Sequence, residues 1–272
     1  MRSNPESVTI RDINTLAEMR QIEVLQKEIW GVEDLEVFPA LALRPLKELG
    51  AVLIGAFNNH DLVGFVFGFP GIIDGETVIH SDLLAVKPEF RSLNLGFLLK
   101  LAQRDKALSL GVNKITWTFD PLQSRNAHLN FAKLGVTSNR YEIDFYGETT
   151  SPLHQGSTDR LWVTWDLKST RVKDRLAHIA EIEEQVPAEA KTLIVISKDG
   201  IPKAEFSTSD ATLLIEIPTI EISKPVRHNW RMATREAFTL AIESGYEVRE
   251  FCRRGPEAGV YVLRRIPSQF DG

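Results

Sequence analysis

Residues 91–96, Arg-Ser-Leu-Asn-Leu-Gly, have the composition of an anion-binding turn. They lie between a stretch typical of a buried strand, residues 81–86, and a stretch with the apolar spacing of an amphipathic helix, residues 95–110. The first N–H groups of a helix have no partner within it and lie at the positive end of its dipole. Small residues let that backbone approach a ligand, Asn94 tolerates a positive φ, and Arg91 adds positive charge. The turn is therefore predicted to bind a pyrophosphate.

This turn resembles motif A of the GNAT superfamily of acyl-CoA-dependent N-acyltransferases. The usual form of that motif is Arg/Gln-x-x-Gly-x-Gly/Ala after a strand. Arg91 and Gly96 match its outer positions, and Asn94 replaces the inner glycine.

A second segment, residues 124–136, resembles motif B of the same superfamily, commonly Asn-x-x-Ala-x-x-x-Tyr-Glu-Lys-Leu-Gly-Phe. Ala127 and the run Lys-Leu-Gly at residues 133–135 are in register with it. Ser124 stands in place of the Asn, and Phe131 in place of a Tyr that often protonates the departing thiolate.

The resemblance implies an acyl-CoA cofactor, acetyl-CoA or another acyl-CoA, and direct attack of an amine on the thioester. The strand backbone would pair with the pantetheine arm and supply an oxyanion donor, the turn would hold the pyrophosphate, and motif B would face the pantetheine or the leaving sulfur. By position, the residues implied to bind the cofactor are Leu84, Ala85, Val86, Arg91, Ser92, Leu93, Asn94, Leu95, Gly96, Phe97, Ser124 and Asn126.

Asp82 is the first candidate for a general base, because it immediately precedes the backbone site on the same strand. His80, two residues earlier on the same strand face, is the second. The alternative is that Asp82 faces solvent or pairs with an arginine. An amine that arrives deprotonated could also lose its proton through water and need no side-chain base.

Since Phe131 cannot donate a proton, a general acid would have to be Tyr146, Tyr141 or a bound water. We take Tyr146 as the candidate, although a tyrosine near a strand end is more often half-buried packing. A thiolate can also leave and be protonated by solvent.

Two other features carry charge. Asp120 precedes a proline at a strand end, where it could hold an acceptor's ammonium group, but a turn former or helix cap is the more common role. Arg227, Arg231 and Arg235 recur at i, i+4 and i+8, typical of a solvated or salt-bridged helix face. Such a face could also reach an acidic acyl chain or a carboxylate substrate.

The elements that must position these residues follow the order β-α-β-β-β-α-β-α-β-β. That is the GNAT order, and the resemblance covers about residues 8–167. We expect an α/β (α+β) fold with a mixed, mostly antiparallel sheet flanked by helices. In the helix after the turn, we expect the buried face to consist of Leu95, Leu98, Leu99, Ala102, the stem of Lys106, and Leu110.

We expect three segments: a GNAT acyl-CoA-binding domain at residues 1–167, a charged helical linker at 168–190 and a C-terminal α/β domain at 191–272. The linker's apolar positions include Ile179 and Ile182. In the tail, a hairpin around Lys198-Asp-Gly200 precedes a β-α-β-β order. That order repeats residues 114–167, so the tail is either a degenerate half of the same fold or a chance recurrence.

Composition excludes several classes. The 272 residues are 43% hydrophobic and 25% charged with a net charge of −5, which argues against a nucleic-acid or anionic-membrane partner. The single cysteine, Cys252, excludes a disulfide framework, and the scattered histidines give no metal-ligand pattern. No signal-peptide or transmembrane stretch is present, so we expect a cytoplasmic protein.

The sequence thus predicts an N-acyltransferase that moves an acetyl or other short acyl group, succinyl included, to a small-molecule amine or an amino acid. We also consider a homodimer. The alternative is a non-catalytic GNAT-like module that binds acyl-CoA as a sensor or scaffold, and a third class is a structural protein that has the fold without binding CoA.

Overall fold

The computed structural model describes residues 8–147, 151, 157–178, 186–187, 190–196, 201–205 and 210–266. The chain forms two compact units. Unit 1 comprises Met1–Trp117, Thr150–Gln155 and Asp166–Lys168, and unit 2 comprises Thr118–Thr149, Gly156–Trp165 and Ser169–Gly272. The domain boundaries expected from the sequence stay a prediction, and each unit is described by itself.

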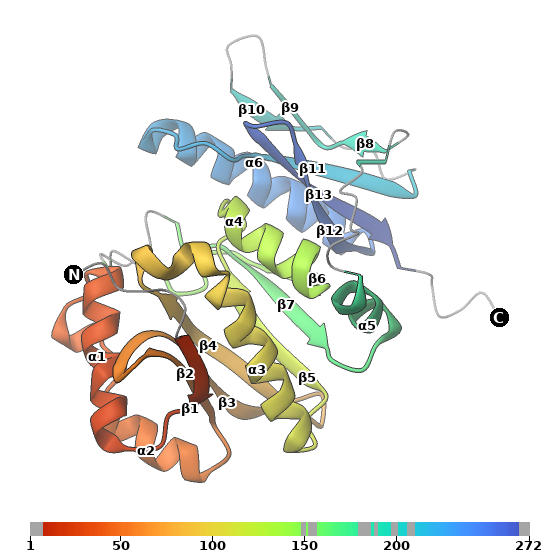
Figure 1. Ribbon diagram of the computed structural model, residues 1–272. Coiled ribbons are helices and arrows are strands. Elements are labelled where there is room, and N and C mark those ends of the chain that lie inside the picture. The colour runs from red at the N-terminus through yellow and green to blue at the C-terminus, as the bar shows by residue number, and fades with distance from the viewer. Residues whose placement is uncertain are drawn as a thin grey trace. The chain divides into compact units, whose positions relative to one another are not determined.

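Unit 1 contains a mixed sheet in the order β1-β2-β3-β4-β5 (Figure 1). Antiparallel ladders join β1 to β2, β2 to β3 and β3 to β4, whereas β4 and β5 are parallel. This is the mostly antiparallel α/β arrangement predicted from the sequence. Its elements are β1 (Val8–Asp12), α1 (Leu16–Trp30), η2 (Asp34–Glu36), α2 (Ala40–Glu48), β2 (Val52–Asn58), β3 (Asp61–Ile73), β4 (Glu76–Val86), η3 (Pro88–Leu93), α3 (Leu95–Ser109) and β5 (Lys114–Phe119).

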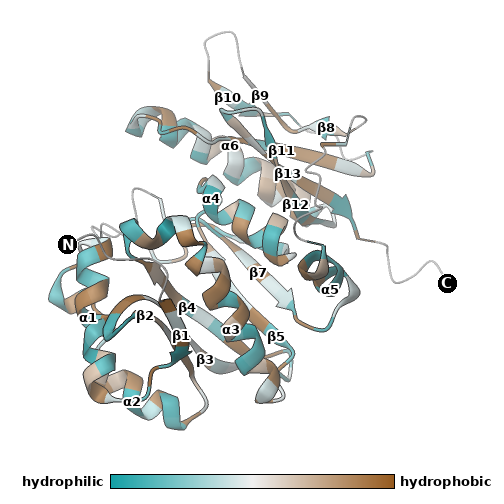
Figure 2. Ribbon diagram, viewed as in Figure 1, coloured by the Kyte–Doolittle hydropathy of each residue, from teal (hydrophilic) through white to brown (hydrophobic). Residues whose placement is uncertain are grey.

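The helix α1 begins and ends where its sequence signals predict. Thr15 and Glu18 form a reciprocal capping box at its start, and Gly31 ends it in the left-handed conformation. The apolar side of α1, with Met19 and Ile22 fully buried, packs on one face of the sheet in a cluster with α2 and strands β2 to β4. Figure 2 shows polar and apolar residues distributed around α1 and α3, as expected of helices with one buried side.

The predicted buried face of α3 was partly wrong. Leu95 and Leu99 are buried, but Leu98 and Leu110 are exposed. The buried positions include two polar residues, Lys100 and Gln103, instead. Apolar spacing alone could not show this, because leucines on this helix lie on both sides and the sheet selects which side is covered.

Unit 2 contains a second run of strands in the order β7-β6-β12-β13-β11-β8, and a separate hairpin of β9 and β10 (Figure 1). The expected helix and strands of the tail are confirmed, whereas residues 198–200 and the linker's Ile179 and Ile182 lie outside the described residues. Its elements are α4 (Ser124–Ala127), η4 (His128–Leu134), β6 (Thr137–Glu142), β7 (Arg160–Asp166), α5 (Thr170–Ala177), β8 (Lys191–Thr192), β9 (Ile194–Ile196), β10 (Pro202–Ala204), β11 (Thr212–Pro218), α6 (Lys224–Glu243), β12 (Tyr246–Arg254) and β13 (Ala258–Arg265).

An aromatic cluster forms the core of unit 2. The ring of Tyr261 on β13 packs edge to face on Phe131 of η4 and Phe238 of α6, with centroids 5.7 and 5.1 Å away. Phe131 is fully buried, so a hydroxyl there would need a partner in an aromatic environment. The tail therefore shares one core with the motif B segment, and strand β12 also pairs with β6 through Val248 and Ser138.

A buried carboxylate fixes the segment before β7 to α6. Asp159 is fully buried and accepts two hydrogen bonds from the Arg235 guanidinium, at 2.9 and 2.7 Å, and one from the Tyr141 hydroxyl at 2.7 Å. Ser157 Oγ and the Asp144 backbone N–H also donate to it. Burial alone would raise the pKa of Asp159, but these hydrogen bonds lower it from 3.8 to about 2.

We expect Asp159→Asn to lower the free energy of unfolding at neutral pH by about 2 kcal/mol, since an amide cannot replace the charged acceptor. The urea midpoint should fall accordingly. The lowered pKa means that the wild-type advantage exists above pH 3.8 and is lost as the pH falls from 3.8 towards 2. Urea titrations at pH 7 and pH 3 measure both effects. Glu236→Gln, an exposed carboxylate on the same helix, is the control. An equal loss at both pH values would contradict this account.

Within the part of the chain that the structure describes, no helix combines the length and apolar character that crossing a membrane requires.

Candidate functional site

The site is built on strand β4, which diverges from β5 partway along its length. The parallel ladder between them registers at only two pairs, Ile79 with Ile115 and His80 with Thr116. Residues 81–86 continue along β3, with which Leu84, Ala85 and Val86 are all in register. Their opposite backbone edge has no registered partner strand among the described residues. A free edge of this kind can hydrogen-bond an extended ligand.

Asp82 occupies a β-bulge at the point of divergence. Phe67 is in register with Leu83 and Gly68 with Ser81, so Asp82 is the extra residue on β4. It makes no hydrogen bond or ion pair within the described residues, so pairing with an arginine is not observed. The side chain is exposed, yet the surrounding protein desolvates it and raises the pKa of its carboxyl group. An unpaired carboxylate with a raised pKa has the properties of a general base.

His80 lies on β4 just before the bulge. Its ring packs against Phe69 with centroids 5.6 Å apart, and its Nδ1 lies 3.3 Å from the Thr116 hydroxyl. Burial, followed by the positive charge of Lys100, lowers the pKa of His80. The imidazole is therefore neutral near pH 7, the form that can accept a proton.

The predicted turn connects η3 to α3 through a residue in the left-handed conformation. Asn94 adopts the left-handed conformation at φ 57° and ψ 24°, ends η3 and begins α3. Leu95 and Phe97 are buried and anchor the turn, whereas a Cβ added to Gly96 would meet nothing within 4 Å. The start of α3 therefore has open space beside its backbone.

The side chains of the turn leave that space accessible. Arg91 Nε donates to the Val86 carbonyl at 3.2 Å, which joins the turn to the end of β4 while the guanidinium remains exposed. Ser92 is exposed and Leu93 is half-buried. The turn thus combines a helix start that has open space at Gly96 with one exposed positive charge, Arg91.

The remaining predicted residues belong to unit 2. Ser124 is half-buried at the start of α4, and Asn126 is exposed with its amide donating to Gln123 at 3.3 Å. The Tyr146 hydroxyl lies 3.4 Å from that of Thr118, and its side chain is exposed. Whether these residues serve the cofactor stays a prediction.

The alternative acid Tyr141 is poorly suited to donate a proton. Burial, together with the Asp159 carboxylate, raises its pKa well above the ordinary value. Its hydroxyl donates to that carboxylate, and its ring stacks on Phe238 with centroids 5.4 Å apart. Tyr141 is thus a structural residue of unit 2.

Asp120 and the arginines of α6 form ion pairs with each other. Both carboxylate oxygens of Asp120 bind arginines, Arg227 at 2.6 Å and Arg231 at 2.5 Å, and Oδ1 also accepts the Leu122 N–H. Asp120 is therefore a turn former within an ion pair, and it is not free to hold an ammonium group. With Arg235 bound to Asp159, the arginine face is salt-bridged as its spacing predicts.

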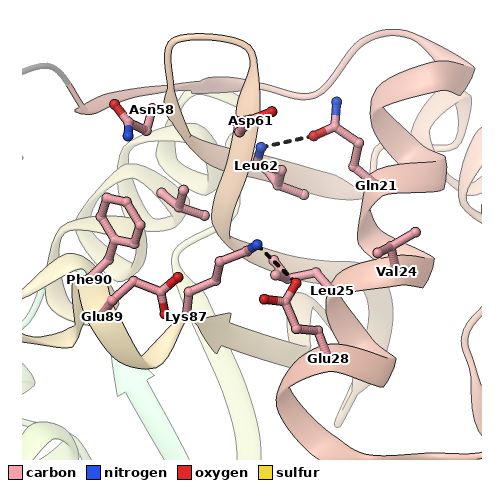
Figure 3. A pocket seen from close by; sticks show the side chains of 11 residues that line it. Gln21, Val24, Leu25, Glu28, Asn58, Asp61, Leu62, Lys87, Glu89 and Phe90 are labelled. Atoms are coloured by element: carbon pink, nitrogen blue, oxygen red, sulfur yellow. Dashed lines mark hydrogen bonds and ion pairs between the residues drawn. The ribbon is translucent and has the colours of Figure 1, made fainter. Parts of the chain in front are cut away.

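A pocket of about 450 Å³ lies in unit 1, between α1, the start of β3 and the segment after β4 (Figure 3). Lys87 forms an ion pair with Glu28 at 2.9 Å, and Gln21 accepts the Leu62 N–H. The carboxylates of its lining oppose a phosphate, so the pocket is distinct from the predicted pyrophosphate site. Its lining residues are Gln21, Val24, Leu25, Glu28, Asn58, Asp61, Leu62, Val63, Lys87, Glu89 and Phe90.

No protein-family model and no curated protein matches the chain. Solved structures do match. The chain is similar to the Escherichia coli ribosomal-protein-S18-alanine N-acetyltransferase, at 13% identity and a TM-score of 0.47, over 60% of this chain and 96% of that one. It is also similar to yncA from Salmonella typhimurium with its cofactor acetyl-CoA, at 16% identity and a TM-score of 0.49, over 60% and 95%. A third is a GNAT-family acetyltransferase from Streptococcus pneumoniae, at 14% and 0.47, over 58% and 98%. Such similarities assign no substrate to this chain.

We expect Asp82→Asn to raise the thermal midpoint at pH 7, because the folded protein disfavours an unpaired carboxylate. Because the pKa of Asp82 is raised in the folded protein, ionisation of its carboxyl group destabilises the wild type as the pH rises above 3.8. Below that value the carboxyl group is protonated in both the folded and the unfolded state. The gain should therefore disappear in acid. Thermal melts at pH 7 and pH 3 test this, and a lower midpoint at pH 7 would contradict it. Because the side chain is exposed, the gain should be small.

Proposed function

We propose that the protein is an N-acyltransferase of GNAT type that moves a short acyl group from acyl-CoA to an amine. The observation that carries the proposal is the divergence of β4 from β5 at the bulge, close along the chain to an open helix start. An extended arm with a pyrophosphate at one end matches both features. The backbone of residues 84–86 would bind the pantetheine along its edge away from β3, and an N–H on that edge would polarise the thioester carbonyl.

In this proposal the acceptor amine attacks the thioester carbon directly. Asp82, with His80 as second candidate, takes the proton that the nitrogen loses as the C–N bond forms. The C–S bond then breaks, and the thiolate of CoA takes a proton from solvent or from Tyr146. The turn from Arg91 to Phe97 holds the pyrophosphate, and Ser124 and Asn126 contact the pantetheine or the sulfur.

We propose acetyl-CoA or another short acyl-CoA, succinyl-CoA included, as the donor and a small amine or amino acid as the acceptor. The paired arginines of α6 give no particular support to an acidic acyl group. A homodimer and a cytoplasmic location remain proposals from the sequence.

The second candidate function is a non-catalytic acyl-CoA sensor or scaffold. The lack of a suitable general acid at two positions favours this function, because Phe131 lies in the core and the hydroxyl of Tyr141 is bound to Asp159. Only Tyr146 remains as a side-chain acid among the tyrosines considered.

Arg91→Ala should weaken the binding of CoA and acetyl-CoA about tenfold, since it removes one exposed charge from the pyrophosphate site. Isothermal titration calorimetry at low salt measures this. Arg91→Lys should retain most of the affinity, and Arg20→Ala, an exposed arginine on α1, all of it. An absence of binding by the wild type would refute both candidate functions.

Asp82→Asn separates the enzyme from the sensor. In the enzyme, loss of the base should reduce kcat by about a hundredfold or more and leave the affinity for acetyl-CoA unchanged. The rate is measured as release of the CoA thiol from acetyl-CoA or succinyl-CoA. Amino acids are screened as the acceptors. If wild type and variant bind acetyl-CoA equally and neither releases CoA, the sensor is favoured. A variant as active as wild type would exclude Asp82 as the base.

A further inference from the structure

Lys100 is fully buried in unit 1, at 2% exposure, without an ion-pair partner among the described residues. A lysine is almost never buried in this way, because desolvation of its charge is costly. Its Nζ donates to the Ser81 hydroxyl at 2.7 Å and to Gln103 Oε1 at 3.1 Å. It also lies 3.7 Å from the centroid of the Trp117 ring.

These contacts fall at the point where the two strands separate. The last registered pair is His80 with Thr116, so Ser81 and Trp117 are the next residue on each strand. One amino group therefore contacts both strands immediately beyond their last pair. Because Lys100 belongs to α3, the same group also joins both strands to the helix that starts at the predicted pyrophosphate turn.

The surroundings are shaped to admit this polar group. A Cβ on Gly68 would lie 2.9 Å from Gln103 Nε2 and 2.8 Å from the His80 carbonyl, so glycine is needed opposite Ser81. Gln103 is itself fully buried, with an Nε2 that finds no partner. Burial lowers the pKa of Lys100 well below its ordinary value, which favours a neutral amine.

We propose that Lys100 is a positioning residue that sets the separation of β4 from β5 and the register of α3 against them. An acyl-CoA would need the free edge of β4 and the start of α3 at a fixed spacing, and Lys100 holds both. The inference extends the proposed function and assigns Lys100 no contact with the reacting atoms.

Three variants test this: Lys100→Met, which keeps the length and removes the donor; Ser81→Ala, which removes only the contact to β4; and Lys106→Met, a half-exposed control on the same helix. Ser81→Ala removes one hydrogen bond and should weaken CoA binding about tenfold, and Lys100→Met, which removes two, should weaken it at least as much. The Lys106→Met control should bind as wild type. A double-mutant cycle of Ser81→Ala with Lys100→Met should show strongly non-additive losses.

Amide hydrogen exchange of the free protein gives a readout that needs no ligand. Residues 81–84 should exchange several-fold faster in Lys100→Met and Ser81→Ala than in wild type or Lys106→Met, because β4 loses one anchor beyond its last pair. Unchanged exchange and unchanged affinity in Ser81→Ala would overturn the proposal even if Lys100→Met fails to fold. If wild type binds no CoA but exchange responds as expected, the proposed function fails while the positioning of the strands by Lys100 stands.

Discussion

The separation of β4 from β5 after His80 is the constraint on which the candidate site depends. A parallel ladder that continued would satisfy the backbone of residues 81–86 on both edges and leave nothing for a ligand. The bulge at Asp82 shifts the register with β3 at this same position. Within the described residues, one irregularity thus accompanies a strand edge without a registered partner and an unpaired carboxylate beside it, the two features that the proposed chemistry uses.

The helix α3 connects that edge to the turn at residues 91–96. Asn94 begins this helix in a left-handed conformation, and its side chain makes no cap. A side-chain cap would compete with a bound anion for the same donors. Further along the same helix, Lys100 contacts β4 and β5 at the point where these strands separate. The helix therefore joins the predicted anion-binding turn at its start to a buried polar contact within its core face.

The core of unit 2 explains why Phe131 stands where motif B commonly has a tyrosine. Phe131 packs among Tyr261 and Phe119, and an aromatic core surrounded by rings favours Phe over a residue that must satisfy a hydroxyl. The tail supplies part of that core, so the motif B segment and the tail are parts of one compact unit. In the same unit, the arginines of α6 bind Asp120 and Asp159, so the basic face of this helix is occupied by partly buried ion pairs.

The sequence by itself determined the order of the elements and the turn at residues 91–96 with its left-handed Asn94, because caps, turns and apolar periods are local signals. It also placed Asp82 and His80 on one strand. Only the tertiary structure decided that Asp82 is a bulge residue and that α3 buries Lys100 and Gln103 in place of Leu98 and Leu110. It likewise decided that Asp120, Asp159 and three arginines pair across more than seventy residues of chain. Register shifts and long-range charge pairs depend on which faces meet, and no local pattern of residues specifies that.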